Sequence, residues 1–125
     1  MNDATRAALA KGGLIDLTTT GRTSGEPRRI EIVLHSIDGR LVVSGMPSPR
    51  TRAWLANVET NPRVTIHLKR GVVADVPGFA RVVTDEQERR DLLAHVARTW
   101  GRSDLEAMVR QSPLIEVVVD AAADA

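Results

Sequence analysis

The chain has 125 residues, of which 42% are hydrophobic and 26% charged, and its formal net charge is +1. This length suits one domain, which we expect to span residues 1–125, and the balanced composition excludes both a disordered chain and a polyelectrolyte partner. The absence of cysteine excludes disulfides, thiolate catalysis and cysteine-ligated metal sites. Three aromatic residues are too few for a surface that stacks on single-stranded nucleic acid, so we expect no nucleic-acid partner.

The N-terminal segment carries an apolar run that is shorter than the hydrophobic core of a signal peptide. Nowhere do about 18 apolar residues run together, as a membrane-spanning helix requires. We therefore expect a cytoplasmic protein with no membrane span. All basic residues except Lys11 and Lys69 are arginine. The planar guanidinium suits phosphate and carboxylate groups, although a GC-rich genome alone explains the same bias.

Hydrophobic periodicity divides the chain into short elements. Alternation with a period of two marks strands, and a period near 3.6 marks helices. In chain order we expect a helix over 3–10, strands over 14–20, 29–37 and 40–45, a helix over 51–60, strands over 63–69 and 72–84, a long helix, a short helix ending at 111, and a strand over 114–120. The Ala/Asp tail beyond that strand is expected to fray.

Turn residues mark several of these boundaries. Asp38-Gly39 predicts a tight hairpin between the second and third strands. Pro62 ends the second helix, because the residue before a proline is disfavoured in the helical region. Pro77-Gly78 predicts a bulge or bend in the fifth strand.

Two capping boxes predict where the last helices begin. Thr84 with Gln87 would open the long helix, and Ser103 with Glu106 would open the short one. The long helix then carries an apolar stripe at helical spacing, formed by Leu92, Leu93, Val96 and Trp100. Mainly antiparallel strands, with one helix between the third and fourth and others before the last, predict an α+β barrel of six strands. Periodicity leaves open an oligonucleotide-binding barrel or an open sheet.

A polar turn joins the first two strands, in the sequence "LTTTGRTSGEPR" that ends at Arg28. It offers the side chains of Arg22, Thr23, Ser24 and Arg28 beside two glycines. Glycines let backbone N–H groups approach an anion, hydroxyls donate hydrogen bonds, and guanidinium forks bind phosphate oxygens in pairs. The turn is therefore either an anion-binding loop or an ordinary hairpin loop with solvated arginines.

A second cluster follows the third strand, where Ser44 and Gly45 lead into a loop with Arg50 and Arg52. This loop runs into a helix N-terminus, whose free N–H groups and dipole favour anions. The meander of the first three strands brings the two clusters toward the same end of the sheet, so they could converge. Trp54 and Asn57, three residues apart, share a face of the helix. The structural alternative makes Trp54 a core residue and Asn57 a helix-end cap.

Hydrolytic and metal chemistry find little support. His35, His67 and His95 lie far apart in the sequence, and the first two are expected on the polar faces of strands. No GxSxG motif occurs, and no paired carboxylates stand in an apolar context. We expect no metal site and no catalytic side chain.

The motifs taken together resemble the deazaflavin-dependent nitroreductase family. The resemblance rests on "LTTTGRTSGEPR", "DGR", "SG" followed by a Pro/Arg loop, "AWLANVETNPRV" and "RVVTDEQERRDLL", in this order over roughly residues 14 to 100. It implies a split β-barrel related in fold to the pyridoxamine phosphate oxidases that bind flavin mononucleotide (FMN). That fold is a six-stranded antiparallel Greek-key barrel with two to four flanking helices, assembled as a homodimer.

The resemblance also implies a function and a site. The family binds the 8-hydroxy-5-deazaflavin coenzyme (F-420) and transfers hydride between it and a small organic substrate, so an oxidoreductase is expected. By the match, Ser44, Gly45 and Met46 would lie near the coenzyme's ring and tail. The other coenzyme-binding residues implied are Arg22, Thr23, Ser24 and Arg28 on the first turn, and Trp54 and Asn57 on the helix after the second loop. From the second cluster itself we add Arg50 and Arg52 as candidate coenzyme-binding residues.

The sequence departs from the family pattern at two places. Thr23 stands where the family usually has lysine, and "TRAWLANV" replaces "HPxWYxNL". The chain also has none of the tyrosines that line substrate pockets in the family. Two alternatives therefore stay open, namely a split-barrel oxidoreductase that binds FMN and a non-catalytic module that binds a lipid or another apolar ligand.

Overall fold

The computed structural model describes residues 1–120, so the predicted fraying tail lies outside the described residues. Four helices are present, at Asp3–Lys11 (α1), Ala53–Thr60 (α2), Glu86–Trp100 (α3) and Leu105–Gln111 (α4). Six strands accompany them, at Gly13–Thr20 (β1), Pro27–Ile37 (β2), Arg40–Ser44 (β3), Arg63–Leu68 (β4), Ala74–Val82 (β5) and Leu114–Val119 (β6). None of these helices is long and apolar enough to cross a membrane.

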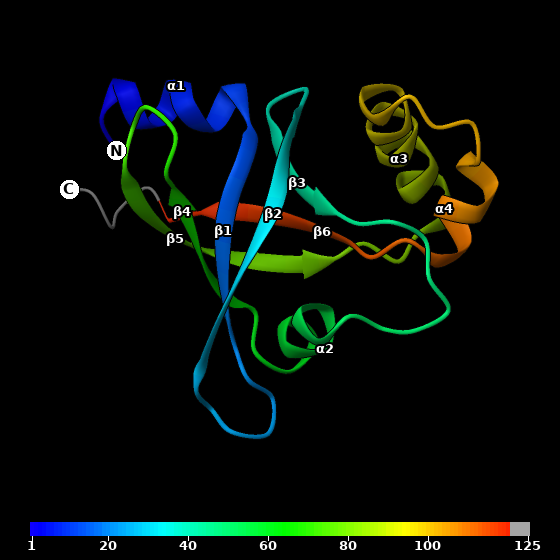
Figure 1. Cartoon of the computed structure of the whole chain (residues 1–125), viewed down its shortest axis with the longest axis horizontal. Helices are drawn as coiled ribbons and strands as arrows, with labels where there is room; N and C mark the ends of the chain where they lie inside the picture. Colours follow the sequence, from blue (N-terminus) through cyan, green and yellow to red (C-terminus); the bar gives the residue numbers. More distant parts are fainter. Residues whose placement is uncertain (121–125) are drawn as a thin grey trace.

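The strands form one closed antiparallel barrel in the order β1-β2-β3-β6-β5-β4 (Figure 1). This confirms the predicted six-stranded α+β barrel. The β1–β2 hairpin is the longest ladder, with Gly13 opposite Leu34 at one end and Thr20 opposite Pro27 at the other. It extends below the barrel beside α2, whereas α3 and α4 lie together at the far side of the molecule (Figure 1).

Turn chemistry explains the second hairpin. Asp38 and Gly39 have φ angles of 50° and 80°, so both lie in the left-handed region. Two consecutive residues with positive φ form the turn whose twist matches that of paired strands, and aspartate followed by glycine is well suited to it. The hairpin predicted from this dipeptide is confirmed.

Two apolar clusters stabilise the fold. The first fills the barrel with alternating residues such as Ile15 and Leu17 of β1 and Ile66 of β4, all at most 1% exposed. The second lies between the outer face of the β2–β3 region and helices α3 and α4, and includes Leu93 and Met108. The predicted helical stripe is thus confirmed, since α3 buries one face against the barrel.

Of the first two histidines, His67 lies on the polar face of its strand, but His35 does not, so the prediction is wrong for His35. His35 is 7% exposed because α3 covers its side of β2, and its ring packs edge-on against Trp100 with centroids 5.2 Å apart. Burial lowers the pKa of His35. His67 is also buried, where its ring contacts the Thr18 hydroxyl at 2.6 Å and the Asp75 carboxylate at 2.7 Å. Helix cover and cross-strand partners, which strand alternation does not encode, bury both rings.

Both predicted helix starts are displaced by one residue. Asp85, not Thr84, caps α3, because its carboxylate accepts the N–H of Glu88 at 2.9 Å. The N-cap of α4 is Asp104 rather than Ser103. The Asp104 carboxylate makes no capping bond, since it accepts a hydrogen bond from Arg102 Nε at 2.8 Å instead.

Strand β5 contains no bulge at its Pro-Gly pair. Its register continues through Pro77 and Gly78 against β4, and from Gly78 onward against β6, with no inserted residue. The strand curves along its length instead (Figure 1). A side chain at Gly78 would meet the carbonyl oxygen of Val118 at 2.6 Å, so glycine permits the close approach of β5 and β6.

Four charged side chains join β3, β5, β6 and the first turn of α3. Arg40 donates to Glu116 at 2.7 Å and to Glu88 at 2.6 Å, and Arg81 donates to Glu88 at 2.7 Å and to Glu116 at 2.8 Å. Hydrogen bonds from Arg81 and then from Arg40 lower the pKa of Glu88 to about 2. The pKa of Glu116 is also lowered, chiefly by Arg40.

This cluster predicts an acid limit to stability. The folded-state pKa of Glu88 lies below its ordinary value of 4.5, so its contribution is present above about pH 4.5 and is lost as the pH falls toward 2. We expect the free energy of unfolding, measured by urea denaturation, to fall over this range. The fall should be smaller in Glu88→Gln and unchanged in Glu59→Gln, an exposed control. Equal pH profiles for wild type and Glu88→Gln would contradict the prediction.

Candidate functional site

The turn between β1 and β2 is held by backbone hydrogen bonds at its base. The Gly21 N–H donates to the Glu26 carbonyl and the Gly25 N–H to the Gly21 carbonyl, both at 2.8 Å. A side chain at Gly21 would meet the Ser24 hydroxyl at 2.6 Å, and Gly25 has a φ of 70°. Glycine at 25 therefore permits the positive φ of the turn, and a side chain at 21 would displace that of Ser24.

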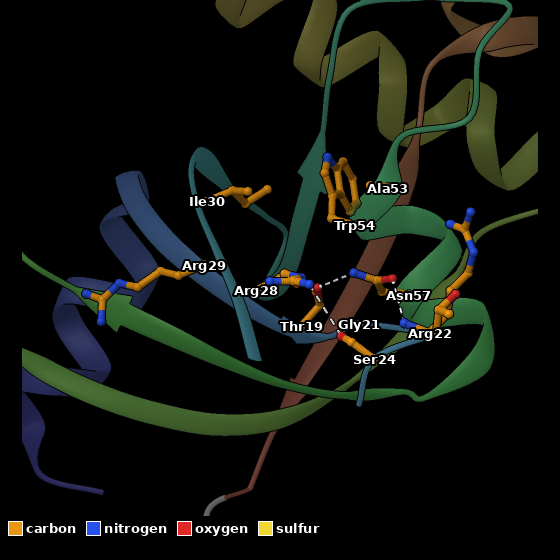
Figure 2. A pocket seen from close by; sticks show the side chains of 11 residues that line it. Thr19, Gly21, Arg22, Ser24, Arg28, Arg29, Ile30, Ala53, Trp54 and Asn57 are labelled. Atoms are coloured by element: carbon orange, nitrogen blue, oxygen red, sulfur yellow. Dashed lines mark hydrogen bonds between the residues drawn. The ribbon is translucent and has the colours of Figure 1, made fainter. Parts of the chain in front are cut away.

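Asn57 of α2 ties this turn to the helix (Figure 2). Its side-chain oxygen accepts the backbone N–H of Arg22 at 3.0 Å, and its side-chain nitrogen donates to the Thr19 hydroxyl at 3.1 Å. Asn57 is 5% exposed, so both side-chain hydrogen bonds are made inside the protein. Its backbone carbonyl accepts the N–H of Asn61. The side chain is a bridge between helix and hairpin rather than a helix-end cap.

A cavity of about 550 Å³ opens between the hairpin and α2. Cross-strand register explains its composition, because Arg28 lies opposite Thr19 and Ile30 opposite Leu17, on the side of the hairpin that faces α2. Trp54 belongs to the barrel core and also forms one wall of the cavity (Figure 2). The lining residues are Thr19, Gly21, Arg22, Thr23, Ser24, Arg28, Arg29, Ile30, Ala53, Trp54 and Asn57.

The charge of Arg22 and Arg28 in this cavity is not compensated by a carboxylate of the described residues. Arg28 makes one long hydrogen bond, to the Ser24 hydroxyl at 3.4 Å, and neither it nor Arg22 has an ion pair with any described residue. Arg29 differs, since its Nε donates to Asp16 at 2.9 Å and its side chain points away from the other side chains that line the cavity (Figure 2). Two guanidinium groups beside a glycine turn suit a phosphate group.

Three residues of the second cluster lie away from this cavity. The Ser44 hydroxyl is buried and donates to the Pro113 carbonyl at 2.6 Å, which ties the end of β3 to the start of β6. Gly45 packs beside the Pro113 ring. Met46 is 50% exposed, and its sulfur accepts a hydrogen bond from Arg102 at 3.0 Å.

Arg50 and Arg52 line a second cavity, of about 450 Å³. It shares no lining residue with the first, so the two predicted clusters converge only in part, through Trp54 and Asn57 at the first cavity. Trp54 and Asn57 face the first cavity, whereas Leu55 on another side of α2 faces the second. The helix between them explains the separation, since residues three apart share its face and adjacent residues do not.

Several lining residues were not predicted from the sequence. Thr19, Ile30 and Ala53 line the first cavity, and Arg89 and Arg110 line the second. The alternation of β1 was a usable signal for Thr19, because it places this residue on the same face as Leu17. No local signal marks Arg89 or Arg110, which reach the second cavity only because α3 and α4 pack there.

Comparisons with known proteins support a common family and fold. A family sequence model described as F420H(2)-dependent quinone reductase matches residues 2–122. A solved structure of an F420-H2 dependent reductase is 22% identical, with 85% of this chain and 94% of that chain covered and a TM-score of 0.61. A putative pyridoxamine 5'-phosphate oxidase from Listeria innocua is 15% identical, with 94% and 92% covered and a TM-score of 0.67. A domain-swapped dimer is 21% identical, with 93% and 95% covered and a TM-score of 0.64.

The bridging role of Asn57 can be tested by removing its amide. Asn57→Ala leaves the Arg22 N–H and the Thr19 hydroxyl without their partner, and we expect a loss of about 1–3 kcal/mol in the free energy of unfolding. Hydrogen exchange at the Arg22 amide should become faster. Thr60→Ala, at an exposed position of the same helix, should change stability by less than about 0.5 kcal/mol. Unchanged stability and exchange in Asn57→Ala would refute the bridge.

Proposed function

Because the chain belongs to the F420H(2)-dependent quinone reductase family, it is a deazaflavin-dependent oxidoreductase that uses F420, and we propose that the coenzyme binds in the cavity between the β1–β2 hairpin and α2. The observation that carries this placement is the pair of guanidinium groups, Arg22 and Arg28, that line the cavity without a carboxylate partner among the described residues. A phosphate in the coenzyme's tail would supply the missing negative charge.

The turn provides further donors to such a phosphate. Thr23 and Ser24 line the same cavity, as does Gly21. Ser24 already contacts both Arg28 and the Glu26 N–H, so its position is set before a ligand arrives. The hydrogen bond from the Arg22 N–H to Asn57 holds the turn against α2. The residues we propose to hold the tail are therefore Arg22, Thr23, Ser24 and Arg28.

Trp54 and Ile30 supply the apolar part of the cavity, and Asn57 fixes its two walls relative to each other. A planar coenzyme ring would gain contact area against such a wall. The reduced coenzyme would supply a hydride there, and a quinone that took up this hydride and one proton from water would become the hydroquinone. The chain's own residues then bind and orient, and none of them is needed as a proton donor.

The family description suggests a quinone as the hydride acceptor of this chain. Oxidation of the reduced coenzyme in the presence of a soluble quinone, followed by its absorbance, tests this assignment.

We also propose that the chain forms a homodimer, because a protein of similar fold is a domain-swapped dimer. Sedimentation should then give twice the chain mass of 13.6 kDa, and a monomer at all concentrations would exclude the dimer.

Coenzyme affinity should depend on Arg28. Replacing it by glutamine removes a charged donor that has no ion pair in the described structure, and charged hydrogen bonds contribute about 1.5–3 kcal/mol. We therefore expect Arg28→Gln to weaken F420 binding by about 10- to 150-fold in calorimetric titration. Arg29→Gln is the matched control, because that arginine pairs with Asp16 and should leave the affinity within about twofold.

Thr23 allows a gain-of-affinity variant in the same titration. Lysine is the usual residue of the family at this position, and a cation there would add to Arg22 and Arg28 around the phosphate. We expect Thr23→Lys to bind F420 more tightly, by about 3- to 10-fold, with a steeper dependence on salt. No measurable F420 binding by the wild type, or equal losses in Arg28→Gln and Arg29→Gln, would overturn the proposed site.

A further inference from the structure

The second cavity has an unusual charge pattern. It lies where the loop before α2 meets α3, α4 and the start of β6, and its lining residues include four arginines, Arg50, Arg52, Arg89 and Arg110. None of the described residues that line it is Asp or Glu. Its volume of about 450 Å³ falls within the range of small-molecule sites in proteins. The cavity therefore concentrates positive charge in a space large enough for an organic ligand.

Arg89 brings a half-buried charge to this cavity. Its guanidinium donates to the carbonyls of Val83 and Val109 at 2.9 Å, of Ser112 at 2.6 Å and of Met108 at 3.3 Å. These bonds satisfy the last carbonyls of α4 but do not neutralise the cation, and Arg89 has no ion pair with the described residues. Burial accordingly lowers the pKa of Arg89. An anion nearby would offset the cost of burying this charge.

Two buried polar atoms of the cavity walls have no hydrogen-bond partner in the described structure. One is the hydroxyl oxygen of Ser112, a residue that is 4% exposed. The other is Nη1 of Arg52, whose Nη2 donates to the Met46 carbonyl at 2.6 Å. Buried donors without partners are rare and costly, so such a pair in one cavity indicates an absent acceptor.

The N-terminus of α2 adds to the positive electrostatic potential of the second cavity. Arg52 is the N-cap residue, and no side chain caps this helix. Leu55 of the first turn lines the cavity, so the positive end of the helix dipole adjoins the four arginines. The outer arginines, Arg50 and Arg110, are exposed and make no side-chain hydrogen bond or ion pair that would occupy them among the described residues.

We propose that this second cavity binds the phosphate or carboxylate group of a small organic ligand, at a site separate from the proposed coenzyme cavity. The Ser112 hydroxyl and Arg52 Nη1 donate to the oxyanion at the inner end, and Arg50 and Arg110 contact it or its substituents at the outer end. Arg89 contributes charge, while its own donors stay on the carbonyls. The remaining volume accommodates the organic part of the ligand.

Calorimetric titration of the full chain tests the site with three probes. Inorganic phosphate, pyrophosphate and citrate separate a preference for phosphate from one for carboxylate. We expect saturable binding of at least one probe, weakened 10-fold or more by Arg110→Gln and by Ser112→Ala. Arg28→Gln, in the other cavity, should leave this affinity unchanged, whereas it should weaken F420 binding. The two sites can thus succeed or fail independently.

Ser112→Ala also gives a ligand-free readout. Because its hydroxyl has no partner, the variant without a probe should have the same melting temperature as the wild type or a higher one, and it should lose the stabilisation that the probe gives the wild type. The proposal is overturned if no probe binds saturably. It is also overturned if binding is lost in Arg28→Gln but kept in Arg110→Gln and Ser112→Ala, since the anion would then occupy the first cavity.

Discussion

Closure of the barrel between β1 and β4 is the constraint on which the first cavity depends. Leu17 pairs with Ile66 across this seam, and both side chains are fully buried in the barrel core. Helix α2 directly precedes β4, so the closure brings α2 beside the turn end of the β1–β2 hairpin (Figure 1). Asn57 can then contact Thr19 and the Arg22 amide, which lie more than thirty residues earlier in the chain. An unclosed sheet would leave the hairpin without its second wall.

Local sequence signals predicted the elements well because each has a local cause. Period-two alternation identified all six strands, and Asp38-Gly39 identified the tight turn through its φ requirements. The errors arose where two neighbouring residues compete for one role or where a nonlocal contact decides. Thr84 and Asp85 are both able to cap a helix, but only Asp85 is placed to accept the Glu88 N–H. His35 alternates as a polar residue would, yet α3 packs over that side of β2 and buries it.

The candidate site, like the fold, was predictable from the sequence only where local signals determine it. The glycine turn and its arginines were evident in the sequence, because loop composition is local. The sequence did not predict which arginines remain without a counter-ion, because this depends on where carboxylates from other strands lie. Arg29 and Arg28 are neighbours of the same type, but cross-strand geometry gives only Arg29 an aspartate partner. The net charge of +1 therefore conceals an uneven distribution, in which paired arginines stabilise the barrel and unpaired ones gather at two cavities.

Both cavities adjoin the same short helix. Helix α2 has eight residues, a little over two turns, and Asn57 and Trp54 face one cavity while Leu55 faces the other. Trp54, packed in the barrel core, and Asn57, bonded to the β1–β2 hairpin, hold this helix in place between the two cavities. The contacts that order the proposed phosphate turn therefore also fix the helix that contributes residues to both cavities.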